Sequence, residues 1–216
     1  MGLFKRADGS GYWEQGNTKV LVAVYGPREA SKREHSLHDR ATLVCEYQVA
    51  TFSSGERRIA SKQDRRSTEV ANFIKATFES ILLLELYPGS QIHLYVTVLQ
   101  ADGGRRAAAI NAATLALSDA GIPMRGLPAA CSIGFLDSTP LLDMNQYEEV
   151  AGGPIIPFVS FPLKEKIVSL QIDNKIPLRY LSQALEVASA GAVAIHKLIV
   201  STLKEHHLKN QPLTAV

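Results

Sequence analysis

The residues best suited to chemistry in this chain form the segment Asp102-Gly103-Gly104-Arg105-Arg106. Two consecutive glycines let a backbone turn tightly and come close to a ligand. A helix that starts here would present unpaired N–H groups, with the two guanidinium groups beside them. This combination is typical of an anion site and best suits a phosphate. The spacing matches neither generic nucleotide-binding motif, and a tight turn with water-facing arginines would leave the same pattern.

The elements that must position this segment can be read on either side of it. Residues 91–99 alternate apolar and polar side chains, which is the period of a half-buried strand. Residues 106–120 are rich in alanine and leucine and are followed by Gly121 and Pro123, so they predict a helix. The candidate anion site therefore lies at a strand-to-helix turn.

A second group of charged residues occupies the predicted loop 53–66, which holds five basic and two acidic side chains. Basic loops usually form solvated surface, but a guanidinium also offers a planar fork of donors to phosphate oxygens. The residues alone leave both interpretations open. After the loop, Ser67 or Thr68 could cap a helix whose apolar face extends to Leu86.

The remaining chain predicts further strands and one long helix. The strands are expected at 19–25, 42–52, 127–135, 159–163 and 167–173, and the helix at 178–207. Turns are expected at residues 8–11 and 16–17, and Gly26-Pro27 is expected to end the first of these strands. This order of strands and helices indicates one α+β domain.

The composition fits one soluble intracellular domain. A chain of 216 residues with 46% apolar content can form one sizeable core. Its net charge of +2 gives no global field, so any RNA site must come from local clusters. Cys45 and Cys131 each lie in an apolar run, which favours buried reduced thiols. We expect no metal site at His35 and His38, no signal peptide and no apolar segment of bilayer length.

Four long strings in this sequence are specific enough to compare with known families: ADGSGYWEQGNTKVLVAVYGPRE, VLQADGG, NAATLALSDAGIPMR and STPLLDMN. They are spread over nearly the whole chain and resemble the RNase PH family, in particular the RNase PH-like ring subunits of the RNA exosome. The resemblance implies the α+β RNase PH fold, related to the second domain of ribosomal protein S5, in a single domain over residues 1–216. Family members usually carry an upstream strand and an Arg-x-Asp-Gly-Arg signature, which this sequence lacks.

The resemblance also implies roles for both groups of charged residues. In the family, the segment after the second glycine binds the attacking inorganic phosphate. This implies phosphate-binding positions at Gly104, Arg105 and Arg106, although Arg105 replaces a small hydroxyl residue. The string RSTE matches the start of the family's long helix, where the arginine helps to hold the 3′ end of RNA. The implied RNA-binding residues are Arg57, Arg58, Arg65 and Arg66.

The family's two acidic catalytic positions fall on Glu149 and Ile155. Phosphorolytic members need a carboxylate at the second position, because a carboxylate can protonate the leaving ribose oxygen or hold a divalent ion. Isoleucine can do neither. We therefore assign no catalytic residue, and Glu149 and Asp143 are the candidates for a substitute carboxylate.

The resemblance thus implies a non-catalytic ring subunit of the RNA exosome that contacts and threads single-stranded RNA. The implied partners are other RNase PH-like subunits in a six-membered ring, S1/KH cap subunits, a hydrolytic nuclease and RNA, with no membrane. The implied locations are the nucleus, nucleolus and cytoplasm, and the implied processes are rRNA processing and mRNA turnover. We expect no cofactor. Phosphate and Mg²⁺ would serve only the alternative, an active phosphate-dependent 3′ to 5′ exoribonuclease. A purely structural ring subunit is the second alternative.

Overall fold

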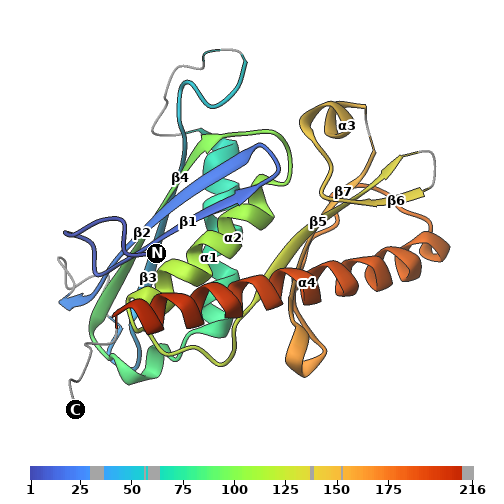
Figure 1. The fold of residues 1–216 in the computed structure, drawn as a ribbon. Helices are drawn as coiled ribbons and strands as arrows, with labels where there is room; N and C mark the ends of the chain where they lie inside the picture. The colour runs from blue at the N-terminus through green and yellow to red at the C-terminus, as the bar shows by residue number, and fades with distance from the viewer. Residues whose placement is uncertain (30–36, 56, 58–63, 137–138, 152, 211–216) are drawn as a thin grey trace.

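The chain folds into two four-stranded sheets with helices between and beside them (Figure 1). The computed structural model describes residues 1–29, 37–55, 57, 64–136, 139–151 and 153–210. Arg58, one of the predicted RNA-binding residues, lies outside these ranges, as does His35. The prediction of an α+β fold is confirmed. The prediction of a single domain over residues 1–216 stays a prediction.

The first sheet has the strand order β1-β2-β4-β3. Its strands are β1 (Gly9–Gln15), β2 (Thr18–Glu29), β3 (Thr42–Val49) and β4 (Ser90–Gln100). β3 runs parallel to β4, and the other pairs are antiparallel. Alternate residues of the two central strands are buried on one face: Val20, Val22, Val24, Ile92, Leu94, Val96 and Val98. That alternation is the signal that predicted β4.

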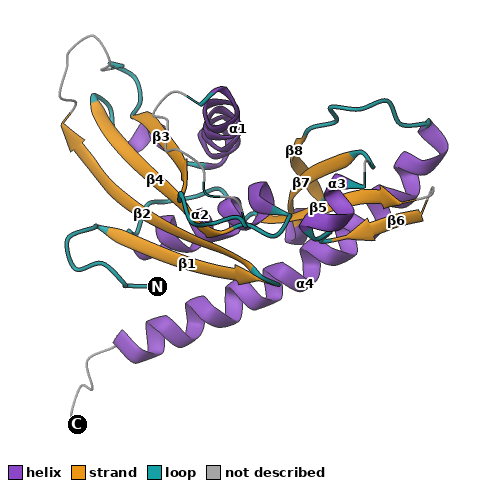
Figure 2. Cartoon of the chain, turned by 90° about the horizontal axis from the view of Figure 1, so that it is seen from above, coloured by secondary structure: helices purple, strands orange, loops and turns teal. Residues whose placement is uncertain are grey.

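Three helical elements belong to the first half of the chain: α1 (Arg65–Ile81), the short η2 (Leu84–Leu86) and α2 (Arg105–Asp119). α2 lies between the two sheets and contacts strands of both (Figure 2). Every residue from Ala107 to Leu117 is buried. Small alanine side chains suit this position, because both sheets must come close to the same helix. α2 also carries the predicted anion site at its first residue.

The second sheet has the order β6-β5-β7-β8, with every pair antiparallel. Its strands are β5 (Ala129–Leu136), β6 (Thr139–Leu142), β7 (Ile155–Phe161) and β8 (Lys166–Leu170). Two short helical elements connect them: α3 (Gln146–Val150) and η3 (Pro162–Lys164). β7 begins four residues earlier than predicted, so Ile155 is its first residue.

The long C-terminal helix α4 (Leu178–Asn210) contacts β5 and β6 and runs from the second sheet back to the N-terminal half (Figures 1 and 2). One stripe of the helix is buried: Ala184, Ala188, Ala192, His196 and Ile199. An 18-residue window of α4 has a mean hydropathy of 1.4, so its length and composition would allow it to cross a membrane. This corrects the expectation that no segment approaches bilayer length. Core helices of soluble proteins pass the same test, so it is weak evidence for a membrane.

The predicted turn at residues 8–11 is wrong, because Gly9 and Gly11 belong to strand β1. Their lack of a side chain serves close packing instead. A Cβ atom on Gly9 would lie 2.3 Å from the carbonyl oxygen of Ala116, and one on Gly11 would lie 2.4 Å from that of Ala112. The two glycines therefore let helix α2 lie against β1.

Two predicted element ends also differ from the structure. Gly26-Pro27 does not end β2, because β4 starts early enough to pair Arg28 with Gln91 after a register shift. Conversely, β3 ends at Val49 and not at residue 52. The short helix α3 was not predicted, because five residues are too few to show a helical period.

Candidate functional site

The turn between β4 and α2 has the backbone conformation that its two glycines predict. Gly103 and Gly104 adopt φ angles of 88° and 58°, in the left-handed region that other residues rarely adopt. A Cβ atom on Gly103 would also lie 2.1 Å from the carbonyl oxygen of Met144. Gly104 is the N-cap residue of α2 and has no side chain to cap the helix. The first backbone N–H groups of α2 therefore remain available to another acceptor.

This helix start opens into a pocket of about 270 Å³. The first half of the chain contributes Gly104, Arg105, Arg106 and Ala107 to its wall. The second half contributes Ser132, Glu149, Gly153, Ile155, Pro157, Asp173 and Asn174. The structure thus brings together the three predicted phosphate-binding positions and both of the family's acidic positions. The pocket lies against the second sheet, at the start of the helix that contacts both sheets.

The side chain of Glu149 accepts a hydrogen bond from the turn, at one of its backbone N–H groups. The backbone N–H of Gly104 donates to Oε1 of Glu149 over 2.9 Å. Asp143 is also close, since a Cβ atom on Gly104 would lie 2.9 Å from its Oδ1. Desolvation raises the pKa of Asp143, while a hydrogen bond from Gln15 opposes this rise. Two carboxyl groups therefore surround Gly104, where an anion would have to bind.

Arg106 is also paired within the chain. Its guanidinium donates to Oε1 of Glu69 over 2.8 Å and to Oε1 of Gln171 over 3.1 Å. A second carboxylate, Asp173, lies 3.5 Å from it. These partners come from α1 and from the segment after β8, so Arg106 links both halves of the chain. Sequence reasoning noted Glu69 only as part of the string RSTE and did not single out Gln171 or Asp173, because nothing in the local sequence marks any of the three as a partner of Arg106.

The pair Glu69–Arg106 brings the starts of two helices together. α1 begins with Arg65 and Arg66, and α2 begins with Arg105 and Arg106. Neither helix has an acidic residue in its first turn, although the helix dipole favours acids there. Four arginines therefore lie at two adjacent helix starts, and one of them, Arg106, is paired with Glu69 and Asp173.

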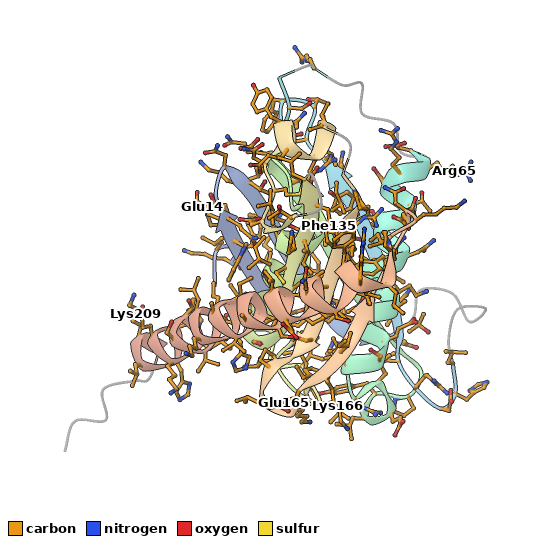
Figure 3. The ribbon with its side chains drawn as sticks, turned by 90° about the vertical axis from the view of Figure 1, so that its right-hand side faces the viewer. Glu14, Arg65, Phe135, Glu165, Lys166 and Lys209 are labelled. Carbon is orange, nitrogen blue, oxygen red and sulfur yellow. The ribbon has the colours of Figure 1, made fainter. Side chains whose placement is uncertain are left out.

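Three of the predicted RNA-binding arginines, Arg57, Arg65 and Arg66, lie on the surface. Arg65 and Arg66 are exposed, and Figure 3 shows Arg65 pointing away from the start of α1. Arg57 is exposed as well and lies in the loop that precedes α1. The cap of α1 is Asp64, whose side chain accepts from the N–H of Arg66, so the predicted caps Ser67 and Thr68 are wrong.

Ser132 is the pocket residue that sequence reasoning missed. It lies on β5 with 5% of its surface exposed, and its buried hydroxyl oxygen has no hydrogen-bond partner among the described residues. A buried hydroxyl without a partner is unfavourable, so a ligand in the pocket would gain a ready donor. The available sequence signal was a single serine inside the otherwise apolar strand 129–136.

Ile155 lines the same pocket at the start of β7. Its side chain offers neither a proton nor a metal ligand at the second acidic position of the family. Within the described residues, no group of three or more His, Cys, Asp or Glu side chains could hold a metal ion. Burial raises the pKa of the Cys45 and Cys131 thiols to about 12, which disfavours their reactive thiolate form.

These features define an α+β protein with a charged pocket where the start of α2 meets the second sheet. Comparison with family models identifies the family more closely. Domain 1 of the 3′ exoribonuclease family, RNase PH, matches residues 1–123, and domain 2 matches residues 126–191. The chain belongs to this family, and the resemblance read from the sequence is confirmed.

Curated relatives match almost the whole chain. It is 48% identical to exosome complex component RRP41 of Mus musculus, over 95% of this chain and 84% of the relative. It is 49% identical to the homologue from Arabidopsis thaliana, over 95% and 86%. It is also 43% identical to Rrp41 of the archaeon Thermococcus onnurineus, over 97% and 84%.

Two solved structures have the same fold. Rrp46 of rice, Oryza sativa, matches with a TM-score of 0.80 and 27% identity, over 93% of this chain and 91% of that one. A chain of the Archaeoglobus fulgidus exosome, with RNA bound to its active site, matches with a TM-score of 0.77 over 90% and 84%. At 19% identity, this second likeness concerns the fold alone.

Proposed function

We propose that this chain is an RNase PH-like subunit of an RNA exosome that grips and threads single-stranded RNA without cleaving it. The names of its close relatives support the exosome assignment. The observation that carries RNA contact is the pairing of two helix starts that each begin with two arginines. Guanidinium groups neutralise backbone phosphates without reading the sequence, which suits a subunit that must pass any RNA.

Three features of the pocket favour a non-catalytic role. Ile155 replaces a carboxylate, and general acid–base help is typically worth about 10² to 10⁴ in rate. Glu149 already occupies the Gly104 N–H group. The pocket wall also holds two arginines and two carboxylates, Glu149 and Asp173, so its formal charges cancel. An incoming phosphate would therefore have to displace acids of the chain itself.

The subunit would act within an assembly. Its proposed partners are other RNase PH-like subunits in a six-membered ring, S1/KH cap subunits and a hydrolytic nuclease that receives the RNA. The proposed processes are rRNA processing and mRNA turnover in the nucleus, nucleolus and cytoplasm. No cofactor is needed for this role.

The second candidate is an active phosphate-dependent 3′ to 5′ exoribonuclease. The observation that favours it is the presence of two carboxyl groups, Glu149 and Asp143, around Gly104. Desolvation raises the pKa of Asp143, which is the direction that a proton donor needs. In this case inorganic phosphate would attack the terminal phosphodiester and release a nucleoside diphosphate.

The deciding experiment uses a ring reconstituted with this chain and a labelled oligoadenylate, with Mg²⁺ and with or without inorganic phosphate. We expect RNA binding and no release of nucleoside diphosphate. The double variant Arg65→Glu and Arg66→Glu should lose RNA affinity. The matched control, Lys197→Glu and Lys204→Glu on the exposed side of α4, makes the same charge change elsewhere and should bind normally.

Phosphate-dependent product that disappears with Arg106→Ala would establish the enzyme. Unchanged RNA affinity in the Arg65 and Arg66 double variant would instead indicate a purely structural subunit, the third possibility.

A further inference from the structure

The tip of the β1–β2 hairpin, residues 15–18, lies against the turn that leads into α2. Gln15 pairs with Thr18 across the hairpin, so Gly16 and Asn17 form a two-residue turn. Figure 1 shows this hairpin tip beside the segment that joins β4 to α2, and hydrogen bonds connect the two. No residue of the tip lines the pocket. The tip can therefore influence the pocket only through the residues that it holds.

Thr18 fixes two successive residues of the turn with one hydroxyl group. It is 2% exposed, and its Oγ1 donates to the carbonyl oxygen of Gly103 over 2.7 Å. The same oxygen accepts from the backbone N–H of Asp102 over 3.0 Å. Removing a partner from a buried polar group is unfavourable. A methyl group in place of this hydroxyl should therefore let the turn relax.

The carboxylate of Asp102 is held by both halves of the chain. Its Oδ2 accepts from the side chain of Asn17 over 2.8 Å, and its Oδ1 accepts from the N–H of Gln146 over 3.3 Å. Beside it, Nε2 of Gln15 donates to Oδ1 of Asp143 over 2.6 Å. The turn thus lies between the hairpin tip on one side and the segment that leads into α3 on the other.

This support matters most for Arg105, the first residue of α2. Arg106 is held by side chains, since its guanidinium donates to Glu69 and Gln171. Arg105 lines the pocket, and it makes no hydrogen bond or ion pair within the described part of the chain. Its position therefore depends on the backbone of the turn. A guanidinium without an acidic partner can also take a phosphate without giving up an existing bond.

We propose that Thr18 and Asn17 are positioning residues that hold Arg105 in place to bind an RNA phosphate, an inference that rests on the proposed RNA-gripping function. Both act through the turn: Thr18 through the backbone of Asp102 and Gly103, and Asn17 through the carboxylate of Asp102. An arginine whose backbone is already fixed loses less freedom when it binds, which strengthens binding.

The test measures the affinity of the reconstituted ring for an oligoadenylate at several salt concentrations. Each phosphate contact to a single strand adds about 0.7 to the slope of log affinity against log salt. Arg105→Gln should lower this slope by about 0.7. Thr18→Val should lower it in the same direction, and Thr18→Ser, which keeps the hydroxyl, should restore it. Asn17→Ala, at an exposed position, should lower it as well with little risk to folding.

Two comparisons distinguish positioning from general destabilisation. Thr77→Val is the matched control, because Thr77 is also buried and its hydroxyl donates to a carbonyl oxygen, that of Phe73 within α1. It should leave the slope unchanged. Thr18→Val should cause no further loss when it is added to Arg105→Gln, because Thr18 acts through Arg105.

The outcomes separate this inference from the function on which it rests. If Thr18→Val and Asn17→Ala both keep the slope while the Arg65 and Arg66 double variant lowers it, positioning is overturned and RNA gripping stands. A Thr18→Val loss that persists in the Arg105→Gln background also overturns positioning. If Thr18→Val prevents ring assembly, Asn17→Ala decides by the same criterion. A slope that none of the arginine variants changes overturns both the inference and the gripping function.

Discussion

Glu149 is the residue whose position says most about what the pocket can bind. Its carboxylate accepts from the N–H group of Gly104, one of the proposed phosphate-binding positions. At an effective dielectric constant near 20, two like charges about 4 Å apart repel by about 4 kcal/mol. The Glu149 carboxylate should therefore oppose the binding of a free anion at Gly104, and removing its charge should favour that binding.

Glu149→Gln is expected to strengthen binding of inorganic phosphate by at least about tenfold, or about 1.4 kcal/mol. The amide oxygen can still accept from Gly104, but the repulsive charge is gone. Isothermal titration calorimetry with phosphate measures the change. Glu148→Gln removes the same charge from the neighbouring residue of α3, outside the pocket wall, and should change affinity far less. Equal effects of the two variants would show that general charge, and not the Gly104 contact, governs binding.

A substitution at Gly104 tests whether the turn needs glycine only for its left-handed φ angle or also because a side chain would clash with Asp143. Gly104 and Gly121 both have left-handed φ angles, 58° and 69°. A Cβ atom on Gly121 meets nothing within 4 Å, whereas one on Gly104 lies 2.9 Å from Oδ1 of Asp143. Gly121→Ala should cost about 1 kcal/mol of unfolding free energy from conformation, and Gly104→Ala should cost more. Urea unfolding followed by Trp13 fluorescence compares them, and equal losses would contradict the steric argument.

Helix α1 shows how a single capping residue determines where Arg65 and Arg66, two proposed RNA-binding residues, lie. Asp64 accepts from the N–H of Arg66, so the helix starts before both arginines and presents them in its first turn. Asp64→Ala should lower the unfolding free energy by about 1 kcal/mol. Ser67→Ala, at the cap position read from the sequence, should have little effect. Chemical denaturation of both variants measures the difference, and a larger loss for Ser67→Ala would contradict Asp64 as the cap.

The elements themselves were predicted well where a long period or a glycine pair marked them. β4, α1 and α2 follow from alternation, from a broad apolar face and from an alanine-rich run, and Gly103-Gly104 follow from turn chemistry. The errors arose where a residue type serves two purposes. Gly9 and Gly11 suggest a turn, yet they permit close helix packing, which depends on Ala112 and Ala116 about 100 residues away.

The candidate site was predictable only in part, because some of its residues meet only through contacts between distant parts of the sequence. Its backbone and arginines are local features of the sequence, so Gly104, Arg105 and Arg106 were found. Ser132 and Asp173 line the pocket, and Glu69 pairs with Arg106, through tertiary contacts that no local spacing records. The balance of charge inside the pocket, which decides whether a free anion can bind, therefore became visible only in the fold.

Helix α4 should make stability depend on pH through His196. This residue is 7% exposed on the buried stripe, and desolvation lowers its pKa from the ordinary 6.5. Below about pH 6.5 the unfolded chain binds a proton that the folded chain resists, so stability should fall as the pH falls. His196→Leu should flatten the fall between about pH 6.5 and 5, whereas His207→Gln, on the exposed end of α4, should not. Urea midpoints across this range test it, and an unchanged slope in His196→Leu would contradict the assignment.

The two sheets are fastened to each other by helices that contact both. α2 lies between them, and the side chain of Asn111 donates to the carbonyl oxygen of Ala130 and accepts from its N–H, each over 2.9 Å. At the far end of α4, His206 lies 3.6 Å from Asp119, the last residue of α2. Asp119 also accepts from the N–H groups of Gly2 and Ser10. These contacts predict that residues 1–216 unfold as a single domain.

Two probes in different sheets can test this prediction in one protein. Trp13, the only tryptophan, is buried in the first sheet, and Cys131 is buried in the second. In a Cys45→Ala background, Trp13 fluorescence and Cys131 thiol labelling should give the same urea midpoint, because a cooperative unit exposes both together. Asn111→Ala leaves buried backbone groups of Ala130 without partners and should cost about 1–3 kcal/mol. In a single domain it must lower both midpoints equally, although the side chain of Asn111 hydrogen-bonds to Ala130 of the second sheet. A shift confined to Cys131 would show two separately folding units, and the pocket between the start of α2 and the second sheet would then depend on how they dock.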